Sequence, residues 1–257
     1  MQNLKTTLVQ CRLAWESAID NRHQFESMLL AHPEPGDLVV LPEMFTTGFS
    51  MNALANAELP GGETEQWMQS LATKLNCAIT GSIAVKDGEV VFNRMLFATP
   101  DRITHYDKRH LFRMAGEHQR YAAGDRRVIV DWRGWRLKLE VCYDLRFPVF
   151  SRNRGDYDAL INVANWPSKR AHHWRALLPA RAIENSAYVI GVNRIGEDAN
   201  GLSYVGDSEV IDFTGERLLV CGDAEGCHTT TLDAEKLIDY RSAFPVHRDA
   251  DDFIIEL

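Results

Sequence analysis

Three residues of types that can perform acyl transfer lie just past segments typical of strands or in a loop. Glu43 follows the apolar run LVVL, Lys108 lies in HYDKRHLF, and Cys142 ends WRLKLEVC. A thiolate is a nucleophile, a carboxylate can carry its proton, and an ammonium group can stabilise an oxyanion. Because α/β folds place ligands at the ends of buried strands, these residues could form one hydrolytic site.

Each of the three residues also has an ordinary explanation. Glu43 could cap a helix or pair at the surface, and Lys108, beside Arg109, could be solvated. Cys142 could be a small core residue, since most buried cysteines are inert. Residue type alone therefore leaves the catalytic and the structural interpretation open.

The composition is that of a globular protein and excludes several partners. The chain has 257 residues, 45% of them hydrophobic, and a net charge of −8. This charge disfavours nucleic acid and anionic membranes as partners. Five scattered cysteines without a CxxC pair indicate neither a disulfide framework nor a zinc site. The N-terminus has no signal-peptide pattern and no run approaches the ~18 apolar residues of a membrane span, so we expect a soluble, cytoplasmic protein.

Strands and helices are expected to alternate in one mixed α/β domain spanning residues 1–257. Short apolar, β-branched runs predict strands at 6–9, 38–41, 77–85, 90–98, 128–132, 135–142, 160–164 and 188–193. Helical spacing of apolar residues predicts helices over 18–30, 63–75 and about 172–187, the last weakened by Pro179. We expect a hairpin over 204–220 around Thr214-Gly215. Residues 243–257 have few turn signals and could cover either a neighbouring subunit or the chain's own sheet.

The three reactive residues lie in segments that occur together in a recognisable order. These segments are LPEMF (41–45), YDKRHLF (106–112) and VCYDLRFP (141–148), and NWP (165–167) and ARAIEN (180–185) follow them. The set resembles the nitrilase, or carbon–nitrogen hydrolase, superfamily over nearly the whole chain. Within it, the chain looks closest to the bacterial omega-amidases. The resemblance implies a four-layer α-β-β-α sandwich and a homodimer.

The resemblance also implies roles for individual residues. Cys142 is the nucleophile, Glu43 the general base and later acid, and Lys108 the stabiliser of the tetrahedral intermediate. Glu117, in GEHQRYAAG, matches a second glutamate that positions substrate and water. The backbone N–H of Tyr143 would share the oxyanion with Lys108. The chemistry requires no metal and no organic cofactor.

Arg146 is the best indication of the substrate. It lies four residues after the nucleophile, and a guanidinium can bind a carboxylate with two hydrogen bonds. Its alternative roles are an ion pair with Asp144 or a buried contact at a helix end. We therefore expect a small 2-oxo dicarboxylic acid monoamide such as 2-oxoglutaramate. Another amide (deaminated glutathione, a carbamoyl amine or an aliphatic amide), a nitrile, and a non-catalytic subunit with the same fold remain alternatives.

Further residues are expected to shape the pocket or to be structural. The predicted pocket walls are Asn165, Trp166, Phe45 and Met114. Adjacent histidines on a helix point in different directions and lack a third ligand, so a metal site at His172-His173 is not expected. Structural ion pairs are expected for Asp158, Arg181 and Glu184.

Overall fold

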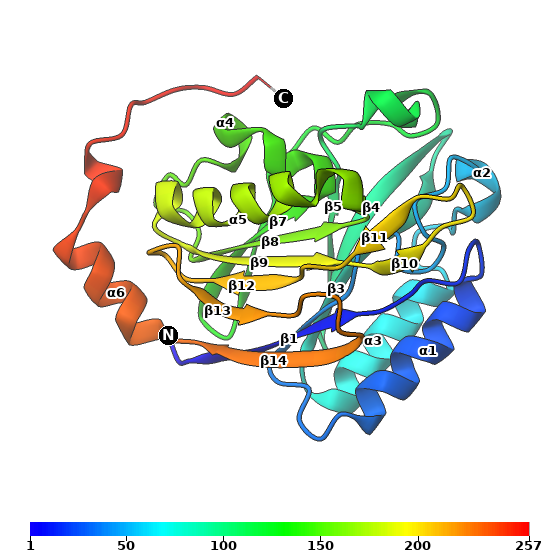
Figure 1. Cartoon of the computed structure of the whole chain (residues 1–257), viewed down its shortest axis with the longest axis horizontal. Coiled ribbons are helices and arrows are strands. Elements are labelled where there is room, and N and C mark those ends of the chain that lie inside the picture. Colours follow the sequence, from blue (N-terminus) through cyan, green and yellow to red (C-terminus); the bar gives the residue numbers. More distant parts are fainter. Residues whose placement is uncertain (257) are drawn as a thin grey trace.

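The computed structural model describes residues 1–256, which form two six-stranded sheets with helices outside them (Figure 1). In sheet order, the first sheet is β14 (Gly226–Leu232), β1 (Leu4–Gln10), β2 (Leu38–Val40), β3 (Ala78–Asp87), β4 (Val90–Ala98) and β5 (Ile103–Asp107). The second is β13 (Arg217–Val220), β12 (Glu209–Ile211), β9 (Tyr188–Asn193), β8 (Ala159–Ala164), β7 (Trp135–Val141) and β6 (Ile129–Trp132). The strands β10 (Ile195–Glu197) and β11 (Ser203–Val205) form a separate pair. The helices are α1 (Ala18–Ala31), α2 (Ala53–Asn56), α3 (Glu63–Leu75), α4 (Pro148–Ser151), α5 (Ala171–Asn185) and α6 (Ala234–Ala243).

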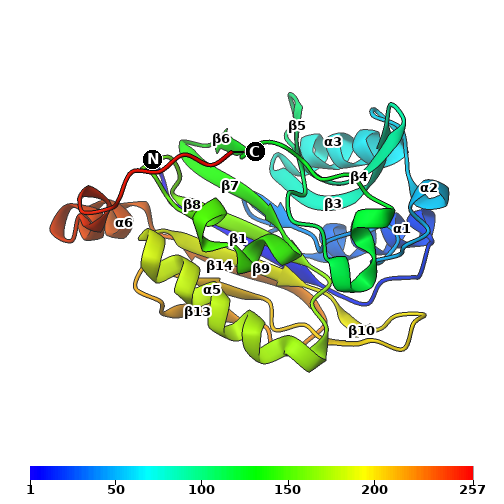
Figure 2. The same cartoon turned by 90° about the horizontal axis from the view of Figure 1, so that it is seen from above.

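The two sheets pack face to face, which confirms the predicted α-β-β-α sandwich. Figure 2 shows α1 and α3 outside the first sheet and α5 outside the second. The core between the sheets takes apolar residues from both, including Val40 and Met95 of the first and Leu139 and Ile161 of the second. Burial of these apolar surfaces stabilises the pairing of the sheets.

Side chains along a strand point alternately to the two faces of its sheet, and in the second sheet both faces are buried. In β7, Leu137, Leu139 and Val141 enter the core between the sheets, so Lys138 and Glu140 point to the opposite face. Both of these charged side chains are fully buried and paired with each other. The second sheet is thus buried on both faces, and its strands cannot show a simple apolar-polar alternation.

Parallel pairing brings the candidate site residues to one edge of the sandwich. β1, β2 and β3 run parallel in the first sheet, and β7, β8 and β9 run parallel in the second. Glu43 follows β2, Cys142 follows β7 and Asn165 follows β8. Lys108 follows the antiparallel strand β5. Carboxyl ends of strands from both sheets therefore meet around one site.

Most predicted elements match the structure within two or three residues, and the hairpin over 204–220 is partly wrong. Only β12 and β13 form it, whereas β11 pairs with β10. Gly206, between β11 and β12, has a φ of +73° and lies directly against the side chain of Gln10. A side chain at Gly206 would clash there, and this bend separates the two strands.

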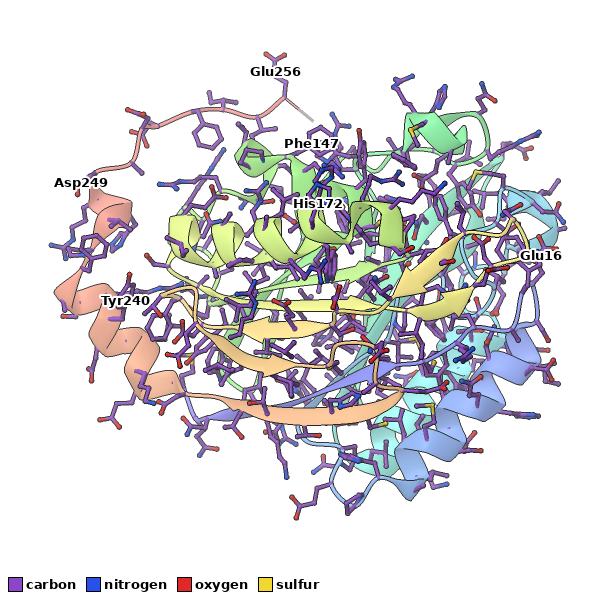
Figure 3. All side chains as sticks on the ribbon, viewed as in Figure 1. Glu16, Phe147, His172, Tyr240, Asp249 and Glu256 are labelled. Carbon is purple, nitrogen blue, oxygen red and sulfur yellow. The ribbon has the colours of Figure 1, made fainter. Side chains whose placement is uncertain are left out.

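Six elements were not predicted: the strands β5, β10 and β14 and the helices α2, α4 and α6. Beyond α6 the chain makes a 3₁₀ turn at Val246–Arg248 and continues without regular structure to residue 256, a course that Asp249 and Glu256 mark in Figure 3. Phe253 of this segment lies under the Arg154 guanidinium, 4.5 Å from the ring centroid. The segment thus contacts its own chain at the loop after α4.

Candidate active site

A cavity of about 310 Å³ opens at the carboxyl ends of the strands. Of the residues predicted for the site, seven line it: Lys108, Met114, Cys142, Tyr143, Arg146, Asn165 and Trp166. The ring of Tyr143 packs edge-on against Phe112 and Phe147. No helix among residues 1–256 is long and apolar enough to span a membrane.

Lys108 lies between two buried carboxylates. Its Nζ donates to Glu43 Oε1 at 2.9 Å and to the Glu117 oxygens at 3.0 and 3.1 Å. All three side chains are fully buried. Burial opposes the charge of Lys108, but Glu117 and Glu43 outweigh it and raise the pKa of the ammonium well above its usual value. Lys108 is therefore a permanent cation held in place by anions on two sides.

The structure fixes Glu43 through neighbours from both sheets. The backbone N–H of Asn165 donates to Glu43 Oε2 at 2.7 Å, and Asn165 Nδ2 donates to the Glu43 carbonyl at 2.6 Å. Asn93 Nδ2, in β4, donates to Glu43 Oε1 at 2.8 Å. The carboxylate is thereby fully engaged and cannot rotate away from Cys142 and Lys108. Asn165 is thus both a cavity wall and a support for Glu43.

Cys142 occupies a tight turn directly after β7. Its φ is +47°, a left-handed conformation that costs a non-glycine residue of order 1–2 kcal/mol. Asp144 holds the turn by accepting the Val141 N–H at 2.9 Å and the Tyr106 hydroxyl at 2.7 Å. The same carboxylate accepts the His110 N–H at 3.0 Å, which ties the turn to the loop that carries Lys108.

The thiol of Cys142 is protonated at rest. Burial and the nearby Glu43 carboxylate raise its pKa well above the usual value, and Lys108 only partly offsets them. Among the carboxylates, Glu43 raises the pKa of this thiol most. Burial also raises the pKa of Glu117, against the opposing effect of Lys108. The arrangement suits a nucleophile that loses its proton to Glu43 only when it attacks.

Arg146 is a cation of the cavity that has no carboxylate partner within the described chain. Its guanidinium lies over the Trp166 ring, 4.7 Å from the centroid, and Nη2 donates to His173 Nδ1 at 2.8 Å. Asp144 is engaged elsewhere, so the ion pair considered for Arg146 does not form. Burial is the main cause that lowers the pKa of Arg146. Its charge is available to an anionic ligand.

The prediction that Phe45 is a pocket wall is wrong. Phe45 is fully buried on the helix side of the first sheet, edge-on to Phe25 at 5.5 Å and 6.0 Å from Trp67. It directly follows Met44, which has a φ of +46°. Because the chain reverses its side-chain direction there, closeness to Glu43 in sequence does not bring Phe45 to the cavity.

The histidine pair is also arranged differently from the prediction. The ring centroids of His172 and His173 lie 4.0 Å apart, so the two side chains do not diverge. His173 also contacts Arg146. The three residues assigned to ion pairs behave as expected. Asp158 pairs with Arg136 and Arg241, and Arg181 pairs with Glu184.

Several site residues were missed. Asn93 gives one signal in the sequence, since it is a polar residue inside the apolar strand VVFNRMLFA. Phe49, Leu202 and Tyr204 line the cavity from loops and from β11. Their contribution depends on the path of those loops, and no local pattern indicates it.

Known proteins are similar to this chain over nearly its full length. The omega-amidase YafV of Yersinia enterocolitica is 49% identical, and the match covers 99% of this chain and all of that protein. The 2-oxoglutaramate amidase of Bacillus subtilis is 31% identical over 94% of this chain and 95% of its own length. These values are far above chance for chains of this length and cover the whole site.

The fold and the family also agree. The crystal structure of XC1258 from Xanthomonas campestris, described as a CN-hydrolase superfamily protein with an arsenic adduct in the active site, superposes with a TM-score of 0.97. It is 47% identical, with 99% of this chain and all of that chain covered. Residues 5–242 match the model of the carbon-nitrogen hydrolase family. This chain belongs to the carbon-nitrogen hydrolase family.

Proposed function

We propose that the protein is an omega-amidase that hydrolyses the terminal amide of a small 2-oxo dicarboxylic acid monoamide, such as 2-oxoglutaramate. The products are the 2-oxo dicarboxylate and ammonia. The observation that carries this proposal is the unpaired Arg146 in the same cavity as Cys142 and Lys108, with Glu43 hydrogen-bonded to Lys108 behind the cavity wall. The names of the relatives, omega-amidase and 2-oxoglutaramate amidase, support the same substrate class.

In the first half-reaction, Cys142 attacks the amide carbonyl while Glu43 takes the thiol proton. The developing oxyanion is stabilised by Lys108 and the backbone N–H of Tyr143. The C–N bond then breaks as Glu43 returns the proton to the leaving nitrogen, and ammonia departs. Because the thiol is protonated at rest, the base is needed in every turnover.

In the second half-reaction, Glu43 removes a proton from water, which attacks the thioester carbon. The C–S bond breaks, and the Cys142 thiol is restored with the proton that Glu43 took from water. Glu117 positions Lys108 and the incoming water, a role supported by its contacts with the ammonium. The cycle transfers the acyl group to Cys142 and then to water without any oxidation or reduction, and it consumes one water for each amide.

Arg146 selects the acyl group. A guanidinium held by Trp166 and His173 presents its remaining N–H groups in a fixed direction, so a carboxylate can accept two of them. A substrate whose carboxylate meets Arg146 while its amide carbon meets Cys142 is bound at both ends. Such binding at two points favours short dicarboxylic monoamides over neutral amides.

The test is ammonia release by the purified protein from 2-oxoglutaramate, glutamine, a neutral aliphatic amide and a nitrile, beside a Cys142→Ala variant. We expect strong preference for 2-oxoglutaramate and a loss of at least about 10³-fold in the variant. The variant should keep the far-ultraviolet circular dichroism of the wild type, because only a sulfur atom is removed. Activity confined to another amide would overturn the substrate, and release that does not need Cys142 would overturn the mechanism.

We also propose the following for the whole protein. Residues 1–257 act as a single domain, supported by the core shared between the two sheets. The protein works in the cytoplasm, a proposal supported by its five free cysteines. It forms a homodimer, which gel filtration with light scattering would test directly.

A further inference from the structure

One buried ion pair of the second sheet has no role in the proposed reaction. Lys138 and Glu140 lie on β7 shortly before Cys142, and both side chains are fully buried. The Lys138 ammonium donates to one oxygen of Glu140, whereas the other oxygen, Oε2, has no hydrogen-bond partner within residues 1–256. Asn162, opposite Glu140 on β8, makes no side-chain hydrogen bond there either. The pair is therefore buried without all the hydrogen bonds that its charges require.

Stability does not explain such a pair. The burial of two charges costs free energy, which their attraction offsets only when further hydrogen bonds satisfy both groups. Glu140 lacks one of these hydrogen bonds. Burial also lowers the pKa of Lys138, and Glu140 opposes this effect only in part. Apolar side chains of similar volume often replace a buried ion pair without loss of stability, so the pair needs another explanation.

The contacts of Lys138 lead toward the turn that carries the nucleophile. Its Nζ lies over the ring of Phe150, 4.3 Å from the ring centroid. Phe150, in α4, is buried, and its ring packs edge-on against His110 at 5.1 Å and at a tilt against Tyr106 at 6.3 Å. The attraction between a cation and a ring is strongest where water is excluded. Lys138 thus holds the ring against which His110 and Tyr106 pack.

His110 and Tyr106 both donate to Asp144. The Tyr106 hydroxyl lies 2.7 Å from Oδ2, and His110 Nδ1 lies 2.7 Å from Oδ1. Burial opposes the charge of Asp144, but His110 and Tyr106 outweigh it and lower the pKa of the carboxyl group. Asp144 in turn holds the left-handed turn of Cys142. A continuous set of contacts therefore connects Lys138 with the backbone that directs the nucleophile.

We propose that the Lys138–Glu140 pair positions the nucleophile Cys142. The pair does not line the cavity, so it acts through other residues, and the proposal rests on the role of Cys142 in the proposed function. Glu140 keeps the lysine charged, and the charge fixes the Phe150 ring. Without the cation this ring is held less firmly, and the two donors to Asp144 lose their fixed places. The turn then directs the thiol less accurately toward the substrate carbon, which lowers the rate of attack.

The experiment replaces the pair by apolar side chains of similar volume in Lys138→Met/Glu140→Met. We expect kcat for 2-oxoglutaramate to fall about tenfold. KM should change less than about twofold, because Trp166 and His173 hold Arg146 independently of the pair. The urea concentration at the midpoint of unfolding should stay the same or rise. Lys138→Arg, which keeps a cation over the ring and a partner for Glu140, should retain most of kcat.

The matched control is Arg217→Met/Glu209→Met. It removes another ion pair of the second sheet, in which Glu209 is buried and neither residue lines the cavity, and it should leave kcat unchanged. A second comparison makes the pair substitution in a Phe150→Leu background. There it should lower kcat much less, because the ring through which the pair acts is already absent.

An unchanged kcat in the pair variant would overturn the proposal. Equal falls in kcat for the pair variant and the control, or a fall in kcat together with a lower urea midpoint, would make the pair purely structural. An undiminished effect in the Phe150→Leu background would reject the route through the ring. If the pair variant does not fold, Phe150→Leu alone must lower kcat at nearly constant KM, and a wild-type kcat in that variant would overturn the proposal. A wild type that prefers another amide rejects only the proposed substrate, and the same comparison is then made with that amide.

Discussion

Cys142 combines a strained backbone with a thiol that is kept protonated. Its left-handed φ points the side chain into the cavity directly after β7, and Asp144 makes the hydrogen bonds that hold the turn. Burial and Glu43 keep its pKa high, so few thiolates form at neutral pH. This limits side reactions of the nucleophile, but it makes turnover depend on the proton acceptor beside it.

The Glu43 carboxylate raises the pKa of the Cys142 thiol and also accepts its proton. Glu43→Gln separates these two effects. We expect kcat to fall by about 10²–10⁴-fold, because no base remains to take the thiol proton. At the same time the pKa of Cys142 should fall, because the substitution removes a negative charge that raises it. The onset of ultraviolet thiolate absorbance on raising the pH should therefore move to lower pH.

The control for this measurement is Cys142→Ala made in both backgrounds, which subtracts the four other cysteines. An unchanged onset would show that Glu43 does not act on the thiol. A variant with near wild-type kcat would show that another group is the base.

Arg146→Lys tests carboxylate recognition at a single residue. Lysine keeps the charge but loses the planar pair of donors, so we expect KM for 2-oxoglutaramate to rise by about tenfold. A neutral aliphatic amide should be affected much less, since it has no carboxylate to bind. Steady-state kinetics on both substrates measures this difference, and equal losses would make Arg146 a structural residue.

At the scale of elements, regular segments were predictable and irregular ones were not. The predicted bounds of α3, β4 and β9 agree with the structure, because α3 has apolar residues at helical spacing and β4 and β9 are mostly apolar runs. α6 has exposed Ile238 and only two buried residues, so its apolar face is weak. The position of Phe45 depends on the left-handed Met44, which no pattern of residue types indicates. Glu43 and Cys142 were found because motif and predicted strand end coincide, whereas Lys108 was found from its motif alone.

The first turn of α5 supplies a support for Arg146 that the sequence did not indicate. His173 Nδ1 accepts a hydrogen bond from Arg146, so Nδ1 carries no proton and the imidazole is neutral. Burial is the main cause that lowers the pKa of His173, and the charges of His172, Arg146 and Arg170 lower it further. The hydrogen bond therefore persists below the usual pH range of histidine and is lost at more acidic pH, when the ring gains a proton.

We expect His173→Ala to raise KM for 2-oxoglutaramate several-fold with a smaller change in kcat, because Arg146 loses its fixed direction. His173→Gln, which offers a carbonyl acceptor, should restore part of the affinity. In the wild type, KM should rise as the pH falls through the lowered pKa of His173, and the alanine variant should lack this rise. Identical pH profiles of KM in the two proteins would contradict the role.

At the scale of the whole molecule, the site exists only because the two sheets pack together. Glu43 and Lys108 extend from the first sheet, whereas Cys142 and Asn165 extend from the second. Two hydrogen bonds cross between the sheets: the Asn165 N–H donates to Glu43, and the Tyr106 hydroxyl donates to Asp144. The core between the sheets therefore sets both stability and catalytic geometry, and activity should report the state of the sandwich.

Ile161→Ala tests this dependence, because Ile161 is fully buried between the sheets. The loss of its side chain should lower the free energy of unfolding by about 2–5 kcal/mol. Ile238→Ala, at a position 55% exposed on α6, makes the same chemical change and should cost less than about 0.5 kcal/mol.

Urea titrations at one fixed protein concentration, followed by circular dichroism and by residual amidase activity, measure both effects. For Ile161→Ala the two midpoints should shift together, since loss of sheet packing also separates Glu43 from Cys142. An activity midpoint that stays at its wild-type value while the circular dichroism midpoint falls would mean that the site survives without the packed sandwich.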